Sequence, residues 1–316
     1  MSTILIASLE PGEGRTAITA GLGARLASDG RAVQLLRIRS GEGADPAAED
    51  DARTLAAVEG CTAPAANAVS EQEAQGALAD ASPLHLVEAP AGSAKELADR
   101  LQAKVILVSA RTDDLRLGEL AAAKSELGDS LLGVIVMREH ERGLDAAAAA
   151  VRERGLRCLG ALPEDRLLAG PNVRELAEAL RASRLVEQGE EEEALEFIML
   201  GPISSDPGQP YFLQHPHKAV INRFDKMDLH LAALATEPEC LVLTGGQQPS
   251  PYLLDRVAGS DLSITVLLSP ENTVRTMELV DDLFPRTRFV GKRKRDRAIE
   301  LVEQHVDLGE ITQGLD

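Results

Sequence analysis

Residues 8–16 of the chain read Ser-Leu-Glu-Pro-Gly-Glu-Gly-Arg-Thr. An apolar run, residues 4–7, precedes them, and a stretch with helical periodicity follows from residue 17. A short buried strand, a glycine-containing turn and a helix, in this order, direct free backbone N–H groups and a helix N-terminus toward an anion. The sequence therefore predicts a phosphate site here. The alternative is an ordinary turn between a strand and a helix, in which the glycines supply only backbone freedom.

This stretch departs from the Walker pattern G-x-x-x-x-G-K-[ST] at two positions. Leu9 stands where the pattern has Gly, and Arg15 stands where it has Lys, whereas Gly14 and Thr16 fit. Arginine holds phosphate oxygens with a fork of donors, but it is bulkier than lysine and places its charge differently. The departures favour nucleotide binding over efficient phosphoryl transfer.

The composition describes a globular chain with few rings in its core. The 316 residues are 44% hydrophobic and 27% charged, but only 2% aromatic, and Trp is absent. Platforms on which bases could stack are therefore scarce. The formal net charge of −18 repels nucleic acid backbones and anionic lipids. We expect no nucleic acid and no membrane as partner, and we interpret the basic run 292–295 as a solvated turn before a helix.

The beginning of the chain carries no targeting pattern. It passes from Met1 into a strand-like segment without a basic region or a long apolar segment, and no later stretch approaches transmembrane length. The expected location is cytoplasmic.

Cysteine and histidine show no metal-site spacing. Cys61, Cys158 and Cys240 lie far apart, so we expect buried free thiols. Residues 215–217 and His230 lack a recognised ligand spacing, and solvated loop histidines explain them better.

Apolar runs alternate with helical stretches along the first part of the chain. Near-continuous apolar runs are typical of a parallel sheet that is covered on both faces. The sequence thus predicts an α/β fold with a P-loop-type parallel sheet and helices on both faces. The expected strands are residues 4–7, 32–38, 84–87, 105–108, 132–136 and 157–162; the expected helices are 16–30, 52–58, 115–127 and 172–185, with a loop at 41–51.

Charged residues end two of these strands. Arg37 and Arg39 follow the second apolar run, and Glu88 follows the third. Because the carboxyl ends of strands line the ligand crevice of an open α/β sheet, both arginines are candidates for anion contact. An acid at such a strand end can hold Mg²⁺, so Glu88 is the candidate metal ligand. The alternatives are surface arginines and a capping acid.

Residues 188–193, Gln-Gly followed by four Glu, form an acidic run that predicts the domain boundary, because a Gly within like charges is poorly suited to packing. We expect a first domain over residues 1–186 and a second, smaller α/β domain over residues 187–316. In the second domain the expected strands are 195–200, 218–222, 240–244 and 263–268, and the expected helices are 227–235, 250–258, 271–283 and 295–306.

The first domain resembles the dethiobiotin-synthetase-like P-loop domains. Residues 7–18 are similar to that family's degenerate P-loop, and residues 87–92 to its Val-Glu-Gly-Ala-Gly-Gly turn, with Glu88 at the acidic position. Residues 159–168 are similar to the Gly-x-Ile-Pro-Glu-Asp segment that follows. The family's Lys-Pro segment is replaced here by Arg37 and the residues after it.

The second domain resembles the domain named for an Asp-Arg-Thr-Gly-Gly motif, DRTGG. Residues 222–228 hold the motif's place in altered form, and residues 243–251 are close to the family's Leu-Thr-Gly-Gly-x-x-Pro-Ser-Pro. Together the two domains look like the N-terminal regulatory part of long phosphotransacetylases and like stand-alone proteins that carry this part alone. Because no catalytic domain accompanies them, we do not expect acetyl-phosphate chemistry.

These observations predict a non-catalytic, nucleotide- or metabolite-sensing regulatory protein. It would bind ATP, another nucleotide or a small phosphorylated metabolite, with Mg²⁺ near Thr16 and Glu88, and no catalytic residue is assigned. The expected ligand-binding residues of the first domain are Gly12, Glu13, Gly14, Arg15, Thr16, Arg37, Arg39 and Glu88.

The second domain would bind a ligand or pair with another subunit through two turns. Both turns follow strands and so lie at the crevice end of the sheet. Tight β–α connections are the alternative, and a homodimer is the expected assembly. The residues concerned are Asp225, Lys226, Asp228, Thr244, Gly245 and Gly246.

Two other functions remain open. One is an ATP- and Mg²⁺-dependent ligase of the dethiobiotin-synthetase type, which needs an arginine that substitutes for the P-loop lysine. The other is an assembly scaffold whose loop binds nothing.

Overall fold

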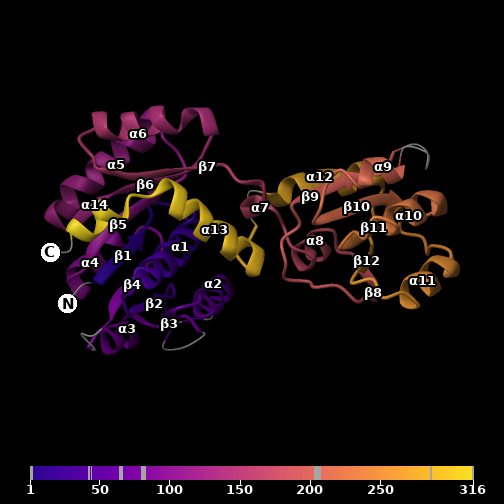
Figure 1. The fold of residues 1–316 in the computed structure, drawn as a ribbon, viewed down its shortest axis with the longest axis horizontal. Helices are drawn as coiled ribbons and strands as arrows, with labels where there is room; N and C mark the ends of the chain where they lie inside the picture. Colours follow the sequence, from indigo (N-terminus) through magenta and orange to yellow (C-terminus); the bar gives the residue numbers. More distant parts are fainter. Residues whose placement is uncertain are drawn as a thin grey trace. The chain divides into compact units, whose positions relative to one another are not determined.

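The computed structural model describes residues 3–41, 43, 45–63, 67–79, 83–202, 208–284 and 287–314, with no side chains described for residues 208 and 209. It divides into two compact units (Figure 1). The first comprises residues 1–165 and 294–316, and the second comprises residues 166–293.

The first unit is built on a seven-stranded, all-parallel sheet with the order β3-β2-β4-β1-β5-β6-β7. Its central strands are apolar on both faces, which suits a sheet covered by helices on each side. The predicted parallel sheet is confirmed. The strands are β1 (Thr3–Ala7), β2 (Val33–Arg37), β3 (Cys61–Thr62), β4 (Leu84–Glu88), β5 (Lys104–Ser109), β6 (Leu131–Glu139) and β7 (Cys158–Pro163).

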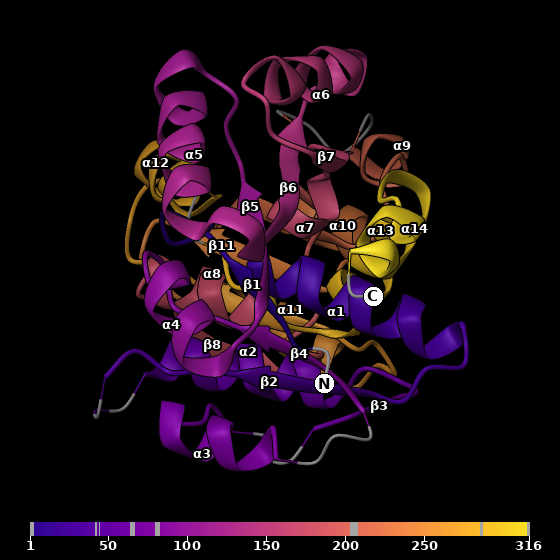
Figure 2. The same ribbon diagram turned by 90° about the vertical axis from the view of Figure 1, so that its left-hand side faces the viewer.

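Helices cover both faces of this sheet (Figure 2). One face carries α4 (Ala94–Leu101), α5 (Asp114–Leu127) and α6 (Leu144–Glu153), which pack on β1 and β5 to β7. The other carries α1 (Arg15–Ser28), which packs on β1, β2 and β4. The remaining elements are α2 (Pro46–Ala56), α3 (Glu71–Ala77), the 3₁₀ turns Gly128–Ser130 and Glu141–Gly143, α13 (Lys292–His305) and α14 (Leu308–Gln313).

The strands that follow β1 in the chain are added first on one side of it and then on the other. From β1 the chain crosses to β2 on one side, and from β4 it crosses to β5 on the other side of β1. Ligands of open α/β sheets bind in the crevice outside the carboxyl ends of strands at such a switch point. The register pairs Arg37 with Glu88 and Ile6 with Glu88, so three strand ends meet at this edge.

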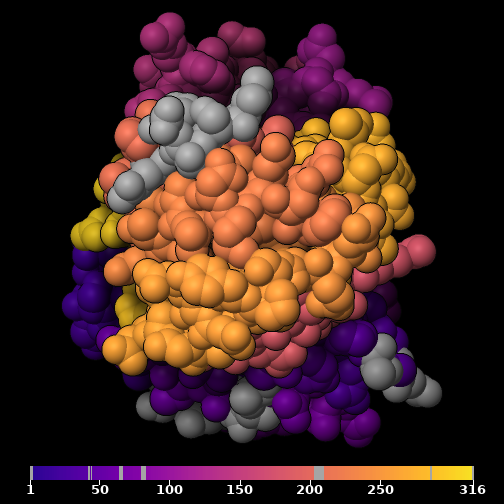
Figure 3. Space-filling model, turned by 90° about the vertical axis from the view of Figure 1, so that its right-hand side faces the viewer, coloured from indigo at the N-terminus to yellow at the C-terminus, as the bar shows by residue number. Residues whose placement is uncertain are grey.

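The second unit is a smaller α/β domain with the sheet order β8-β12-β11-β10-β9, in which β8 is antiparallel to β12. Figure 3 shows its surface, to which α10 and α11, in orange, contribute. The strands are β8 (Ser183–Glu187), β9 (Phe197–Leu200), β10 (Lys218–Arg223), β11 (Cys240–Thr244) and β12 (Thr265–Leu268); the helices are α7 (Arg166–Ala169), α8 (Val173–Ala179), α9 (Gly208–Phe212), α10 (Met227–Leu234), α11 (Pro251–Ala258) and α12 (Thr273–Leu283).

The two units divide after residue 165 and after residue 293, and not at the expected boundary between residues 186 and 187. That boundary falls at the end of β8, within the sheet of the second unit. The helix expected over residues 172–185 ends at Ala179, and its last residues instead form β8, while residues 294–316 return to the first unit. The apolar side of α8 packs with β10 and β11, so it belongs to the second core.

The acidic run 188–193 is not a linker. Glu191 accepts hydrogen bonds from Arg184, and the carboxylate of Glu193 accepts the backbone N–H groups of Lys292 and Arg293 at the start of α13. The acids therefore pack because cations and a helix N-terminus lie opposite them. The basic run 292–295 accordingly lies in the first turn of α13 and is not a turn before it.

Among the described helices, none combines the length and the apolar character that crossing a bilayer requires.

Candidate functional site

The loop between β1 and α1 presents backbone N–H groups. Gly12 and Gly14 have φ values of 76° and 93°, which favour glycine, and a Cβ on Gly14 would lie 2.9 Å from Met137 Cε. Gly14 is the N-cap residue of α1, and no side chain caps this helix end. Within the described part of the chain, no atom accepts a hydrogen bond from the N–H groups of residues 12–17. Such a row of free donors at a helix N-terminus suits an anion.

Arg15, in the place of the Walker lysine, is buried and turned to the end of β4. Its Nη1 donates to the carbonyl of Ala89 at 2.6 Å, and its Nε lies 3.9 Å from Glu88 Oε1. Burial lowers the pKa of this guanidinium, and the charge of Glu88 opposes that effect. Arg15 is thus at the site, but its guanidinium has partners within the protein.

Glu88 is the centre of a buried polar cluster. Its Oε1 accepts a hydrogen bond from the Thr16 hydroxyl at 3.0 Å and lies 3.3 Å from Arg37 Nε, while its Oε2 has no partner. Only 1% of Glu88 is exposed. Burial, and then the charge of Asp51, raises the pKa of the Glu88 carboxyl to about 7 against the opposing charges of Arg37 and Arg15.

Asp51 completes this cluster, and the sequence did not reveal it. Its Oδ2 lies 3.2 Å from Arg37 Nε, and it also interacts with the Thr16 hydroxyl. Burial raises the pKa of the Asp51 carboxyl, and Arg37 opposes the rise. We expected a loop through residue 51, whereas α2 begins at Pro46 with Asp45 as its N-cap. An Asp-Pro pair is a helix-start signal and could have placed Asp51 on a helix.

Arg39 does not join the cluster. Its Nη1 donates to the carbonyl of Ala68 at 3.2 Å, and its Nη2 lies 3.7 Å from Glu73 Oε2. Arg39 therefore has partners outside the cluster, and its contact with an anion stays a prediction.

The acids of the loop are held by Arg116 of α5. Its Nη2 lies 2.6 Å from Glu10 Oε2 and 3.5 Å from Glu13 Oε1. Glu13 also accepts the backbone N–H of Glu10 through its other oxygen. Glu13, an expected ligand-binding residue, thus faces a buried guanidinium.

The oxygen donors of the cluster fit a magnesium ion in part. Mg²⁺ takes one or two carboxylates together with phosphate oxygens and water. Thr16, Asp51 and Glu88 offer a hydroxyl and two carboxylates, and the unpartnered Glu88 Oε2 is an oxygen still to be satisfied. No group of three His, Cys, Asp or Glu side chains that could hold a metal occurs in the described ranges, so phosphate oxygens and water would have to complete the shell.

The turn residues of the second unit lie at the carboxyl ends of β10 and β11. Asp225 forms two hydrogen bonds with Arg223, at 2.7 and 2.6 Å. The N–H groups of Gly245 and Gly246 donate to the carbonyls of Glu271 and Ser269. Thr244 Oγ1 lies 2.7 Å from Thr273 Oγ1, Lys226 N donates to the Arg223 carbonyl, and Asp228 is in the first turn of α10. The glycine donors of these turns are therefore used within the fold.

The expectations for the cysteines and the histidines are met in part. Cys61, Cys158 and Cys240 are free thiols; Cys158 and Cys240 are buried as expected, whereas Cys61 is only half-buried. The expectation of solvated histidines is wrong for His230, which is fully buried and whose Nε2 lies 2.9 Å from the Arg223 carbonyl. His215 stacks on Phe197 with ring centroids 3.9 Å apart.

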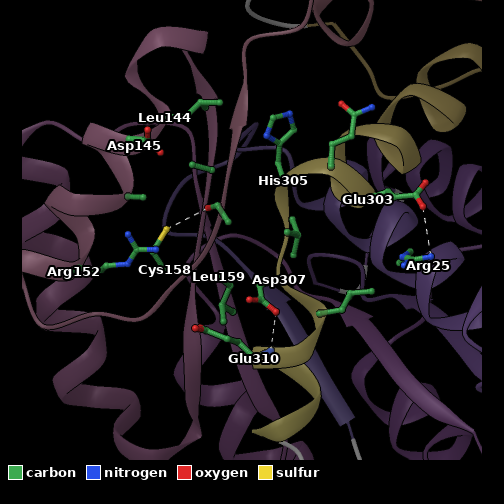
Figure 4. Close-up of a pocket in the computed structure, with 16 residues that line it drawn as sticks. Arg25, Leu144, Asp145, Arg152, Cys158, Leu159, Glu303, His305, Asp307 and Glu310 are labelled. Carbon is green, nitrogen blue, oxygen red and sulfur yellow. Dashed lines mark hydrogen bonds and ion pairs between the residues drawn. The ribbon is translucent and has the colours of Figure 1, made fainter.

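A cavity of about 610 Å³ lies beside β7 in the first unit. No residue of the loop between β1 and α1 lines it. Figure 4 shows Arg25 paired with Glu303 and the thiol of Cys158 directed at a backbone carbonyl in its wall. Four carboxylates against two guanidinium groups make its wall unsuited to a polyphosphate. The carboxylates are those of Asp145, Glu303, Asp307 and Glu310, and the guanidinium groups are those of Arg25 and Arg152.

Comparison with known proteins supports the two-part resemblance. Residues 175–283 match the family model described as DRTGG domain. The chain is 22% identical over 223 residues to a phosphate acetyltransferase of Nitratidesulfovibrio vulgaris, and the match covers 61% of this chain and 31% of that protein's length.

Several solved structures are similar to parts of this chain at low identity and low TM-score. The MinC:MinD cell division complex of Aquifex aeolicus has 18% identity and a TM-score of 0.42, and covers 53% of this chain and 84% of that chain. A nucleotide-binding protein of Archaeoglobus fulgidus in complex with ADP has 14% identity and a TM-score of 0.39, over 52% and 82% of the two chains. The CBS and DRTGG domains of Clostridium perfringens pyrophosphatase, solved with diadenosine tetraphosphate, have 16% identity and a TM-score of 0.31, over 36% and 46%. These values are too low to carry a ligand from one protein to another.

Proposed function

We propose that this chain, whose second unit carries a DRTGG domain, is a regulatory protein that binds a nucleotide or another phosphorylated metabolite at the loop between β1 and α1. The observation that carries the proposal is the row of backbone N–H groups over residues 12–17 that have no acceptor among the described residues. Phosphate oxygens are acceptors of the right charge for donors at a helix N-terminus.

The ligand is sensed and not turned over. In phosphoryl transfer the P-loop lysine stabilises charge on the phosphate that moves. Here Arg15 takes that place, and its guanidinium is engaged by the carbonyl of Ala89 and faces Glu88. Binding through backbone donors does not need this charge, whereas transfer does.

Thr16, Asp51 and Glu88 would hold Mg²⁺ together with the phosphate, and Arg37 would contact the phosphate as a cation. The bound metal would neutralise part of the phosphate charge. The regulatory part of the proposal rests on the resemblance to the N-terminal part of long phosphotransacetylases. The turns at residues 225–228 and 244–246 are then the candidate surface for a second ligand or for the other subunit of a cytoplasmic homodimer.

The test compares Gly12→Asp with Gly12→Asn. A Cβ on Gly12 meets no atom within 4 Å, and Asp and Asn are the side chains that best tolerate its φ. Both variants carry the same strain, but only Asp adds a charge beside the amides. With ATP or ADP at about 100 times its Kd, the wild type should gain roughly 2.7 kcal/mol of stability.

We expect Gly12→Asn to keep a thermal shift with nucleotide and Gly12→Asp to lose it. Equal shifts in both variants, or no shift with any nucleotide in the wild type, would contradict the proposal. Release of phosphate from ATP that depends on Mg²⁺ and disappears in Arg15→Ala would instead support the dethiobiotin-synthetase-type ligase.

A further inference from the structure

Arg37 lies where a cation shared by two carboxylates would lie. Its Nε is 3.2 Å from Asp51 Oδ2 and 3.3 Å from Glu88 Oε1. The Nε–H group donates a hydrogen bond to Asp51, and the same guanidinium forms an ion pair with Glu88, so one cation serves both acids. Arg37 and Glu88 are 6% and 1% exposed, so water screens this contact little.

A metal ion cannot bind the same two oxygens while Arg37 stays there. Mg²⁺ binds its oxygen ligands at about 2.0–2.1 Å, which requires the space between the carboxylates. A dication beside a buried guanidinium is also strongly repelled. Arg37 must therefore leave before Asp51 and Glu88 can share a metal.

Leaving is costly unless the guanidinium finds a new partner. A buried charge that loses its partner costs several kcal/mol. The loop amides of residues 12–17 belong to the same edge of the sheet, because β2, β4 and β1 are neighbours there. A phosphate bound by these amides offers oxygens that suit the planar fork of an arginine.

We propose that Arg37 is an internal counter-ion that keeps the Asp51–Glu88 pair closed to divalent cations until a bound phosphate draws its guanidinium away. This inference rests on the proposed phosphate site. It makes metal and phosphate binding mutually dependent through one side chain: the phosphate replaces the carboxylates as the partner of Arg37, and the metal replaces Arg37 as the partner of the carboxylates.

The test uses Mn²⁺ as a probe, titrated by electron paramagnetic resonance without nucleotide. Arg37→Gln removes the charge, and Arg39→Gln, at the arginine that pairs with Glu73 outside the cluster, is the matched control. We expect Arg37→Gln to bind Mn²⁺ at least tenfold more tightly than the wild type and Arg39→Gln to bind like the wild type. Adding Asp51→Asn to Arg37→Gln should abolish the gain.

Mn²⁺ affinity that is unchanged or lower in a folded Arg37→Gln variant overturns the inference. Should that variant not fold, a second measurement tests the inference by the nuclear magnetic resonance signal of the Arg37 Nε–H group in the wild type. This signal is assigned by its absence in Arg37→Lys. It should shift when ADP is added without metal, and an unmoved resonance under saturating ADP overturns the inference. A failure of the proposed function would give a different result, because ADP would then bind neither the wild type nor Arg37→Gln.

Discussion

Arg116 and Glu10 join α5 to the loop between β1 and α1, with Nη2 of the arginine 2.6 Å from Oε2 of the acid. The same nitrogen lies 3.5 Å from Glu13 Oε1, and the other, Nη1, pairs with Glu119. Arg116 is only 1% exposed, whereas Glu10 reaches solvent. A single buried cation is therefore shared by three carboxylates, and two of them, Glu10 and Glu13, belong to the loop and would otherwise repel a phosphate at its amides more strongly.

Arg116→Gln should weaken nucleotide binding about tenfold or more, because Glu10 and Glu13 lose their counter-charge while the backbone donors stay. Arg111→Gln is the matched control, since Arg111 is exposed and pairs with Asp113, and among the described residues no ion pair joins it to Glu10 or Glu13. Isothermal titration with ADP at low and high salt measures the effect, and added salt should reduce the difference because the repulsion is screened. Equal affinities for Arg116→Gln and wild type would show that the loop acids do not act on the ligand.

The sequence predicted the parts of the site that lie in one short segment or at one strand end. The loop 8–16, Arg37 and Glu88 come from local patterns, and the parallel sheet brings their strand ends together. Asp51 and Arg116 were not predictable in this way. Each approaches the site from a helix, and a helix pattern does not tell which of its polar residues turns toward a distant loop.

The fold was predictable for a similar reason, and the domain boundary was not. Apolar runs mark buried strands, so β10, β11 and their neighbours were found near their observed bounds. The acidic run 188–193 has the composition of a linker, but partners from residues 184, 292 and 293 neutralise it. Such pairing depends on the tertiary fold, and composition alone does not show it.

Glu193→Gln should lower the stability of the protein by about 0.5–2 kcal/mol, the range for a lost N-cap. Its two oxygens accept the N–H groups of Lys292 and Arg293 at 2.9 and 3.1 Å. The amide of Gln can replace only one acceptor and carries no charge for the helix dipole. Glu190→Gln is the control, because Glu190 lies exposed in the same acidic run. Urea unfolding measures both, and equal losses in the two variants would contradict the capping role.

His230 should make the second unit less stable in mild acid. Burial lowers the pKa of this histidine, against weaker opposite effects of the Arg223 carbonyl and of Asp228 and Asp225. The folded protein thus resists the proton that the unfolded chain takes up near pH 6.5. The stability that neutral His230 provides is present above pH 6.5 and is lost as the pH falls below it.

The measurement compares urea unfolding at pH 7.5 and pH 5.5 for the wild type and His230→Gln, which can still donate to the Arg223 carbonyl. The carboxylates are the same in both proteins. The difference between the wild type and the variant in how much the free energy of unfolding changes from pH 7.5 to pH 5.5 therefore reports His230 alone. We expect the wild type to lose more stability over this interval than the variant. A steeper loss in the variant would mean that the folded state favours the charged imidazole.

Gly21→Ala should destabilise the first unit, although alanine is the better helix former. A Cβ on Gly21 of α1 would clash with Val302 Cγ2 and would lie 3.0 Å from the Ala298 carbonyl of α13. Overpacking of this kind costs about 1–3 kcal/mol, more than the roughly 1 kcal/mol that helix propensity returns. Gly118→Ala in α5 is the control, since nothing lies within 4 Å of its added Cβ, and it should stabilise the protein. Adding Val302→Ala to Gly21→Ala should recover part of the loss in a thermal unfolding series. Without such recovery, the clash with Val302 is not the cause of the lost stability, and the close approach of α13 to α1 does not explain why residue 21 is a glycine.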